Sequence, residues 1–309
     1  MIKTEAKLSL PDHRAKISGH MLHERHSSGW LYKTAMFFVL AMIAVELLMI
    51  VGFLYDDHEV KGDIAVIDVK GQIMESREII SRIKTYREME EVKAIVMAVD
   101  SPGGAVAASQ EIHDEILKTK KKKPVVISMG NVAASGGYYL AVAGNKIIAN
   151  PGTITGSIGV ITQFFIAENL LRKFNVSWEV IKSGENKDIG SPLKRLSPAQ
   201  RALLQSMIDD TYEQFVEAVS KGRNLSVEEV KAIADGRIVS GRQALEAKLV
   251  DELGGLEHAI DVAAKLAKVE GKPTIVYPKQ EKFTWFNRIA DGKLNLSPSG
   301  LQVQYQMMP

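Results

Sequence analysis

An apolar stretch near the N-terminus constrains this chain more than any other feature. Residues 34–55 read TAMFFVLAMIAVELLMIVGFLY, in which Glu46 is the only charged residue. A helix of about 20 apolar residues is long enough to cross the ~30 Å hydrocarbon core of a bilayer. A cleaved signal peptide has a shorter apolar core and a small-residue cleavage site, and neither fits this stretch. The sequence therefore predicts an uncleaved transmembrane anchor over residues 34–55.

The charges on either side of this stretch predict its orientation. The first 33 residues carry a group of basic side chains, namely Lys3, Lys7, Arg14, Lys16, Arg25 and Lys33. The residues after the stretch begin with acids, at Asp56, Asp57 and Glu59. Because basic residues stay on the cytoplasmic side, residues 1–33 are expected to form a cytoplasmic tail. Everything beyond the anchor is then expected outside the membrane.

The remaining residues have the composition of a folded protein. The chain has 309 residues, of which 46% are hydrophobic, so residues 56–272 are long enough to form a domain with its own core. The net charge of +2 gives no reason to expect a nucleic-acid partner. The absence of cysteine excludes disulfides, thiolate zinc sites and a cysteine nucleophile. Residues 273–309 contain one further strand and a tail whose role the sequence leaves open.

The outer part alternates short β-branched runs with segments of helical periodicity, which predicts an α/β fold with a mostly parallel sheet. Strands are expected at 64–71, 93–104, 124–130, 146–150 and 178–184. Helices are expected over 76–91, from Ala105 onward and directly after Ser135. From 197 to 269 the pattern is mainly helical, and it contains the capping box Ser226 to Glu229. This section is expected to pack on the α/β core.

Three short elements rich in Gly or Ser follow predicted strands, at the edge where parallel sheets place their ligand sites. They are DSPGG at 100–104, AASGG at 133–137 and TGSIG at 155–159. Acyl transfer needs a nucleophile, a base and two N–H donors for the oxyanion. Ser135 offers a hydroxyl at a helix N-terminus, and the backbone N–H groups of Gly104 and Gly136 are candidate donors.

The base is the harder residue to find. The histidines beyond the anchor are His58, His113 and His258, and none of them follows a predicted strand. A lysine serves instead when burial lowers its pKa from about 10.4 by several units. Lys187 in IKSGENKDIGSP is the best candidate. The residues alone favour the alternative that Lys187 is a solvated loop residue paired with Asp188.

Four motifs in order carry a family resemblance: DSPGG, SMGNVAASGGYYLA, NPGTITGSIGVI and IKSGENKDIGSP. Together they resemble the bacterial signal peptide peptidase A family of membrane-anchored serine proteases, in its short single-domain form. The resemblance implies that Ser135 is the nucleophile and Lys187 the general base. It also implies that Ser157 orients the lysine amine, and that the N–H groups of Gly104 and Gly136 form the oxyanion hole.

The same resemblance implies the fold and the setting of the protein. The core is expected to be the βαβ spiral that Clp protease subunits and crotonases share. A homo-oligomeric ring is implied, in which one subunit supplies the serine and its neighbour the lysine. The expected location is the bacterial inner membrane, with the catalytic domain in the periplasm. The implied substrates are peptides, above all signal-peptide remnants, and neither a metal nor a cofactor is expected.

Three alternatives stay open at this point. A related membrane protease would cleave other membrane proteins, and the sequence offers no feature that separates it from a signal peptide peptidase. A crotonase-like acyl-CoA enzyme would use the same backbone N–H groups on a thioester, although no acidic residue stands at a matching catalytic position. A catalytically inactive membrane scaffold would keep the fold alone, yet Ser135, Ser157 and Lys187 are all present.

Overall fold

The computed structural model describes residues 27–55, 62–277 and 304–306. The chain divides into two compact units, Met1–Val60 and Lys61–Pro309. In the first unit the described residues form one helix, α1 (Ser27–Tyr55), which contains the whole apolar stretch. Within the described part of the chain, no helix combines the length and the apolar composition that a membrane span requires. His58, most of the predicted cytoplasmic tail and most of the C-terminal segment lie outside the described residues.

The second unit is built on a mostly parallel sheet, as the alternation of strands and helices predicts. The strands lie in the order β7-β6-β4-β2-β1-β9, and β5 pairs with β4 and β8 beside this path. All pairs in this sheet are parallel except β6 with β7. The strands are β1 (Ile64–Lys70), β2 (Ala94–Ser101), β4 (Val125–Ala134), β5 (Lys146–Ala149), β6 (Ile154–Gly156), β7 (Ile238–Ser240), β8 (Glu252–Leu253) and β9 (Ile275–Val276).

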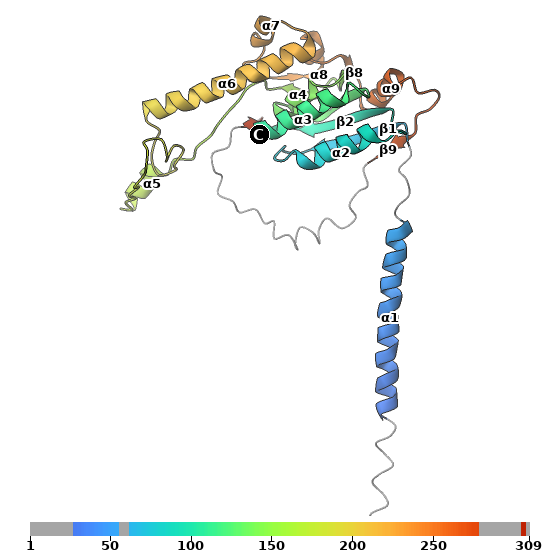
Figure 1. Ribbon diagram of the computed structural model, residues 1–309. Helices are drawn as coiled ribbons and strands as arrows, with labels where there is room; N and C mark the ends of the chain where they lie inside the picture. The colour runs from blue at the N-terminus through green and yellow to red at the C-terminus, as the bar shows by residue number, and fades with distance from the viewer. Residues whose placement is uncertain (1–26, 56–61, 278–303, 307–309) are drawn as a thin grey trace, which may run out of the picture. The chain divides into compact units, whose positions relative to one another are not determined.

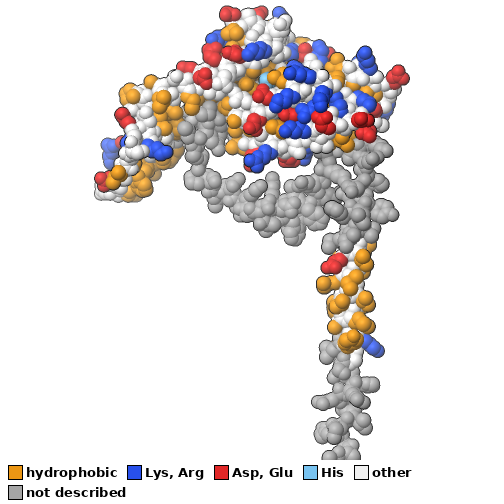
Figure 2. Space-filling view, in the orientation of Figure 1, with side chains coloured by type: hydrophobic (Ala, Val, Ile, Leu, Met, Phe, Trp, Pro, Cys, Tyr) orange, Lys and Arg blue, Asp and Glu red, His pale blue; other side chains and the backbone are white. Residues whose placement is uncertain are grey.

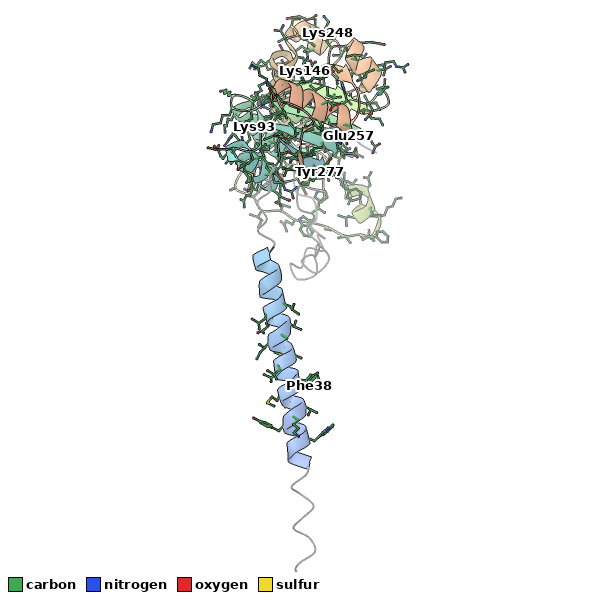
Figure 3. All side chains as sticks on the ribbon, turned by 90° about the vertical axis from the view of Figure 1, so that its right-hand side faces the viewer. Phe38, Lys93, Lys146, Lys248, Glu257 and Tyr277 are labelled. Atoms are coloured by element: carbon green, nitrogen blue, oxygen red, sulfur yellow. The ribbon has the colours of Figure 1, made fainter. Side chains whose placement is uncertain are left out.

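Helices cover both faces of this sheet (Figure 1). On one face α2 and α4 contact the strands, and α3 packs between these two helices. On the other face α9 lies across β1, β2, β4 and β5, in the view of Figure 3, where Glu257 marks it. The helices of this unit are α2 (Arg77–Glu88), α3 (Val106–Thr119), α4 (Gly136–Ala141), α5 (Glu168–Lys173), α6 (Pro198–Arg223), α7 (Val227–Lys231), α8 (Gly241–Glu246) and α9 (Leu256–Leu266).

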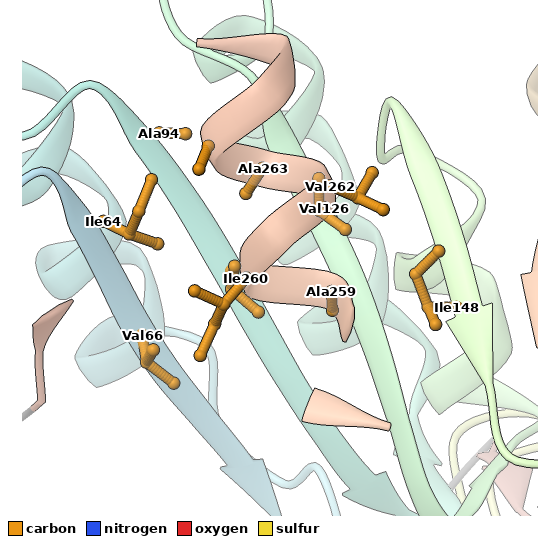
Figure 4. Close-up of a cluster of buried hydrophobic side chains, with 11 residues drawn as sticks. Ile64, Val66, Ala94, Val126, Ile148, Ala259, Ile260, Val262 and Ala263 are labelled. Atoms are coloured by element: carbon orange, nitrogen blue, oxygen red, sulfur yellow. The ribbon is translucent and has the colours of Figure 1, made fainter. Parts of the chain in front are cut away.

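Two-sided coverage explains why the strands read as continuous apolar runs. Alternate residues of each strand point to opposite faces. Figure 4 shows the cluster under α9, in which Ile260 lies beside Ile64 and Val66 of β1. On the opposite face, Ile67 and Met97 are buried beneath the other helices. Burying each such side chain contributes about 1.5–3 kcal/mol, so the sheet is a rigid platform for the residues at its ends.

The later helices begin where capping signals predict. Ser197 accepts a hydrogen bond from the N–H of Gln200, and the Gln200 side chain accepts one from the N–H of Ser197. The predicted capping box between Ser226 and Glu229 is also present, at the start of α7. These reciprocal bonds satisfy N–H groups that lack partners at a helix N-terminus. The 26-residue helix α6 therefore starts at a fixed point, directly after a segment that leaves the sheet.

That segment, residues 160–197, is called the arm here, and it extends from the sheet layers to the free end of α6 (Figure 1). It contains α5 and a large share of the exposed apolar side chains (Figure 2). The strand predicted over 178–184 is wrong, because residues 178–182 form no regular secondary structure, residues 183–184 form a bend, and none of them pairs with a strand. Their β-branched and aromatic side chains favour a pleated surface, yet the described residues offer no neighbouring strand edge to complete one.

A second, small sheet lies beside α3 and α4. It consists of β3 (Gly103–Ala105) and β10 (Gln304–Gln306), which pair antiparallel with Tyr305 opposite Gly104. The two strands are about 200 residues apart in sequence. The C-terminal segment, whose role the sequence leaves open, thus places three residues beside the predicted oxyanion-hole glycine.

Candidate active site

Ser135 occupies the junction between β4 and α4. Its φ of 53° and ψ of −118° lie in a region that residues with a Cβ rarely adopt. Two backbone hydrogen bonds hold it there: its N–H donates to the Gly156 carbonyl at 2.9 Å, and its carbonyl accepts from the Tyr139 N–H at 2.8 Å. Such strain costs about 1–3 kcal/mol and persists only where the surroundings enforce it. The junction matches the strand-to-helix turn that a nucleophilic serine needs.

The Ser135 side chain is buried and unpartnered. The residue is 1% exposed. Among the described residues, Ser135 Oγ is the only buried side-chain oxygen or nitrogen without a hydrogen-bond partner. A buried hydroxyl in that state costs about 1–3 kcal/mol. The described residues therefore leave this oxygen available to a group that they do not supply.

Ser157 lies next to Ser135 because β4 and β6 are parallel and in register. Ala134 pairs with Gly156, so the serine that follows each strand is at the same level of the sheet. Ser157 also has a positive φ, 49°, and its N–H donates to the Arg237 carbonyl at 2.8 Å. It lines a pocket of about 550 Å³ together with Asp209 and Tyr212. The two predicted serines are thus brought together by strand register.

The glycines of the predicted oxyanion hole are both buried. Ile73 bonds to the neighbours of Gly104 on β3: its N–H donates to Gly103 and its carbonyl accepts from Ala105. Because successive backbone groups of a strand point to opposite edges, the N–H of Gly104 points away from Ile73. Gly136 is the first residue of α4, where N–H groups lack helical partners.

Gly104 also leaves no room for a side chain. A Cβ at this position would lie 2.1 Å from the carbonyl oxygen of Ile73. Gly137 is similarly constrained, since its Cβ would lie 2.8 Å from the carbonyl oxygen of Ser101. Gly104 thus allows β3 to lie close to Ile73, and Gly137 allows α4 to lie close to the end of β2.

Three residues that the motif analysis passed over build the junction. The Asp100 carboxylate accepts a hydrogen bond from the Val132 N–H at 3.0 Å, at the place where the pairing of β2 with β4 shifts register. Thr155 Oγ1 donates to the Ala133 carbonyl at 2.6 Å, and Ser101 Oγ accepts from the Gly103 N–H at 3.1 Å. The available signal for them was the position of these polar residues in β2 and β6, the two strands on either side of β4.

The histidines do not supply a base to Ser135. His113 is buried in α3, where its ring lies 5.0 Å from that of Tyr139 and burial lowers its pKa. His258 lies on α9, across the sheet from α4, and its Nε2 is 2.9 Å from Glu252. Neither ring is a hydrogen-bond partner of the Ser135 hydroxyl. The sequence-based exclusion of both residues therefore agrees with their positions.

Lys187 lies on the arm, in the loop between α5 and α6, and it is exposed. The structure does not join it to Ser135 within one chain, because Ser135 Oγ has no partner. The alternative in which Asp188 pairs with Lys187 is also not what the structure has. The Asp188 carboxylate instead contacts Lys182 and Lys194, at 2.8 and 2.9 Å.

A second cavity adjoins β3. It has a volume of about 500 Å³ and combines apolar with charged side chains, namely Met74, Glu75, Ser76, Arg77, Ala105, Ala107, Ala108 and Glu111. Ser76 donates a hydrogen bond to Glu111 across it. The described residues contain no group of three or more His, Asp or Glu side chains that could hold a metal ion. The site is therefore a serine at a strained turn, flanked by backbone donors and by two cavities.

Comparison with known proteins gives a consistent result. Residues 117–270 match the profile of Peptidase family S49, and residues 61–153 match that of Clp protease. A protein from Synechocystis sp., named as a protease, is 48% identical over 209 residues, which cover 67% of this chain and 75% of that protein. An Enterococcus faecium protein, named as signal peptide peptidase SppA, is 40% identical over 64% of this chain and 58% of its own length. The chloroplastic serine protease SPPA of Arabidopsis thaliana is 35% identical, over 68% of this chain and 31% of its own length.

Proposed function

Because this chain belongs to peptidase family S49 and is a serine protease, we propose that it cleaves peptide bonds with Ser135 as nucleophile and Lys187 as general base. The observation that carries the proposal is the buried, unpartnered hydroxyl at a strained turn. A side chain kept in that state has no structural benefit, whereas nucleophilic catalysis requires it. The family also favours peptide hydrolysis over acyl-CoA chemistry, which is one of the alternatives that the sequence leaves open.

The residues would act in the following way. The neutral amine of Lys187 takes the proton from Ser135 Oγ as that oxygen attacks the substrate carbonyl. The N–H groups of Gly104 and Gly136 stabilise the oxyanion that forms. The resulting ammonium then protonates the leaving amine. Water finally hydrolyses the acyl-enzyme and frees Ser135. Ser157, at the same level of the sheet as the nucleophile, would hold the amine of Lys187 by a hydrogen bond and orient its lone pair.

The lysine would come from a neighbouring subunit. Lys187 is exposed on the arm, so the base and the nucleophile of one chain do not meet. The arm carries apolar side chains that pack against little within the protomer: Phe165 is 76% exposed, Trp178 68% and Ile181 97%. Such a patch is typical of a surface that another molecule covers. Assembly would also remove water from the lysine, which favours its neutral form.

The substrate and location form the finer part of the proposal. The unbroken apolar sequence of residues 34–55 supports a membrane anchor, with the catalytic domain on the outer, periplasmic face of a bacterial inner membrane. An anchored protease of this kind would meet apolar segments released from the bilayer. Signal-peptide remnants are such segments, and the name of the Enterococcus relative points to them. Other membrane-derived peptides are the alternative class of substrate.

Complementation between two inactive variants tests the shared dyad. We expect Ser135→Ala and Lys187→Ala to be inactive alone, because one lacks the nucleophile and the other the base. In mixed rings of equal composition, about a quarter of the interfaces would combine an intact serine with an intact lysine. Hydrolysis of an apolar peptide should therefore return to about a quarter of the wild-type rate.

A fluorophosphonate probe on the full-length protein provides the matching site assay. Labelling should map to Ser135, rise toward alkaline pH and be absent in Lys187→Ala. His113→Ala serves as the control, since it should still be labelled. Mixed rings that form but stay inactive would contradict the shared dyad, and labelling that persists in Lys187→Ala would contradict the lysine base.

A further inference from the structure

The loop that carries Lys187 is organised around one carboxylate. Asp188 Oδ1 contacts the ammonium groups of both Lys182 and Lys194, at 2.8 and 2.9 Å. Lys182 also donates to the Glu185 carbonyl at 2.9 Å. The Asp188 side chain is 13% exposed, so water competes little for it. Asp188, the residue that follows Lys187 in sequence, thus binds lysines from both ends of the loop through one oxygen atom.

The backbone of the same loop is closely wound. The Lys187 N–H donates to the Gly184 carbonyl at 3.2 Å, and the Ser191 N–H donates to that of Asp188 at 3.1 Å. Gly190 has a φ of 79° and packs so closely on Phe164 that a Cβ would lie 2.6 Å from the ring. These contacts hold the loop in one defined conformation within the arm, which is unusual for an exposed segment.

The lysines of the loop differ in whether they form an ion pair. Of its three lysines, Lys182 and Lys194 are bound by Asp188, whereas Lys187 makes no ion pair with any described residue. Hydrogen bonds from Lys182 and then Lys194 lower the pKa of Asp188 to about 2, so this carboxylate is charged at any working pH. The remaining acid whose charge acts on the cluster is Glu185.

We propose that Asp188 is a positioning residue for the catalytic base: by binding Lys182 and Lys194 it fixes the loop and leaves Lys187 as the amine presented to the neighbouring subunit's serine. This inference rests on the proposed function. Two consequences follow from the geometry. Without Asp188 the loop loses the ion pairs to Lys182 and Lys194, and the amine of Lys187 loses its fixed position. Without the two lysines the carboxylate becomes free to pair with Lys187, which would keep that amine protonated.

The two disruptions should shift the pH dependence in opposite directions. Asp188→Asn removes a negative charge beside Lys187 and keeps two positive ones, so the pH of half-maximal kcat should fall. Lys182→Met with Lys194→Met frees the carboxylate, so that pH should rise. Each shift is expected to be about half a pH unit or more. A loop that only maintains the fold would lower kcat in both variants without moving either midpoint.

The test uses the full-length protein in detergent, with kcat and KM measured on an apolar peptide across pH. Asp188→Asn should lower kcat about ten-fold or more with KM nearly unchanged, because misplacing a base affects the transition state rather than peptide binding. Asp188→Glu should recover part of the loss. Glu78→Gln is the matched control, since it neutralises a carboxylate on α2, away from the arm, that is paired with Arg82 at 2.6 Å, and it should leave kcat and the midpoint unchanged.

The outcomes separate this inference from the proposed function. If Lys187→Ala retains activity, the proposed dyad fails. If Lys187→Ala is inactive while Asp188→Asn matches the wild type, or if both midpoints stay unchanged, only the positioning role is overturned. Lys194→Met alone, which leaves Lys182 on the carboxylate, replaces the double variant should that one not assemble, and its midpoint should rise by a smaller amount.

Discussion

At the scale of single residues, the site is marked by unfavourable backbone conformations and by a side chain without a hydrogen-bond partner. Ser135 combines a disfavoured backbone conformation with an unpartnered buried hydroxyl. Ser157, one strand away, also has a positive φ. Natural proteins accept such local costs where a reactive group must be held in place. The strain at this position therefore supports the role of nucleophile that is proposed for Ser135.

Replacing Ser135 by glycine should stabilise the protein while abolishing its activity. Glycine removes the strained Cβ and the orphan hydroxyl, each costing about 1–3 kcal/mol. The greater flexibility of unfolded glycine takes back about 0.5–1 kcal/mol. The free energy of unfolding should rise by about 1–5 kcal/mol, seen as a melting temperature several degrees higher.

Ser128→Gly is the control for that measurement. Ser128 lies in the same strand, β4, and has an ordinary strand conformation, so glycine there should lower the melting temperature. A Ser135→Gly protein that melts below the wild type would show that the strain at the junction is not a net cost.

At the scale of elements, β3 is the critical strand although it has only three residues. One of its edges bonds to Ile73 and the other pairs with β10. The second edge is the one toward which the Gly104 N–H points, and β10 also contacts α4. A peptide whose carbonyl binds that N–H must lie along this edge, in the manner of an added strand. If the N–H of Gly104 binds the oxyanion as proposed, β10 and an extended substrate would compete for the same edge of β3.

Truncation after residue 303 should raise activity toward added peptides. Removing β10 leaves the edge of β3 open at all times. The apparent affinity for a peptide is otherwise reduced in proportion to the fraction of molecules whose edge is open, so it should rise when β10 is removed. KM should fall about two- to ten-fold with little change in kcat. Truncation after residue 306, which keeps β10, is the matched control. An unchanged or higher KM after the longer truncation would mean that β10 does not hinder substrate binding.

At the scale of the whole molecule, the arm separates the two proposed catalytic residues. Ser135 is buried at the end of β4, and Lys187 is exposed beyond the sheet layers on a segment rich in uncovered apolar side chains (Figure 2). Under the proposed mechanism, a single folded chain would be an incomplete protease. Activity would arise only on assembly, which protects the cell from isolated subunits.

The Ile181→Glu variant should disrupt assembly without disturbing the protomer. Ile181 is almost fully exposed, so within one chain the change costs little. If a neighbour covers this side chain, its burial contributes about 1.5–3 kcal/mol per interface, equivalent to about ten- to a hundred-fold in the dissociation constant. Sedimentation velocity should show smaller particles, and peptide hydrolysis should fall in parallel.

Glu257→Lys, a charge reversal on α9, is the control for this experiment (Figure 3). It should change neither the size of the particle nor its activity. Wild-type sedimentation of Ile181→Glu would contradict the assignment of the arm to the subunit interface.

Periodicity and capping are local properties, so the sequence alone indicated β1, β2, β4 and β5 and the helices between them, but not the short strands β6, β7 and β8. It also indicated Ser135, since a nucleophile between small residues at a strand end is a local pattern. Local patterns failed at residues 178–184, whose β-propensity finds no partner strand, and at Asp188, whose carboxylate binds Lys182 and Lys194 rather than its neighbour in sequence.

Only the tertiary structure decided how distant segments meet. Strand register placed Ser157 beside Ser135, chain folding laid β10 along β3, and the arm carried Lys187 away from the serine. The reason is physical: propensity acts over a few residues, whereas strand pairing and burial are settled among residues far apart in the chain.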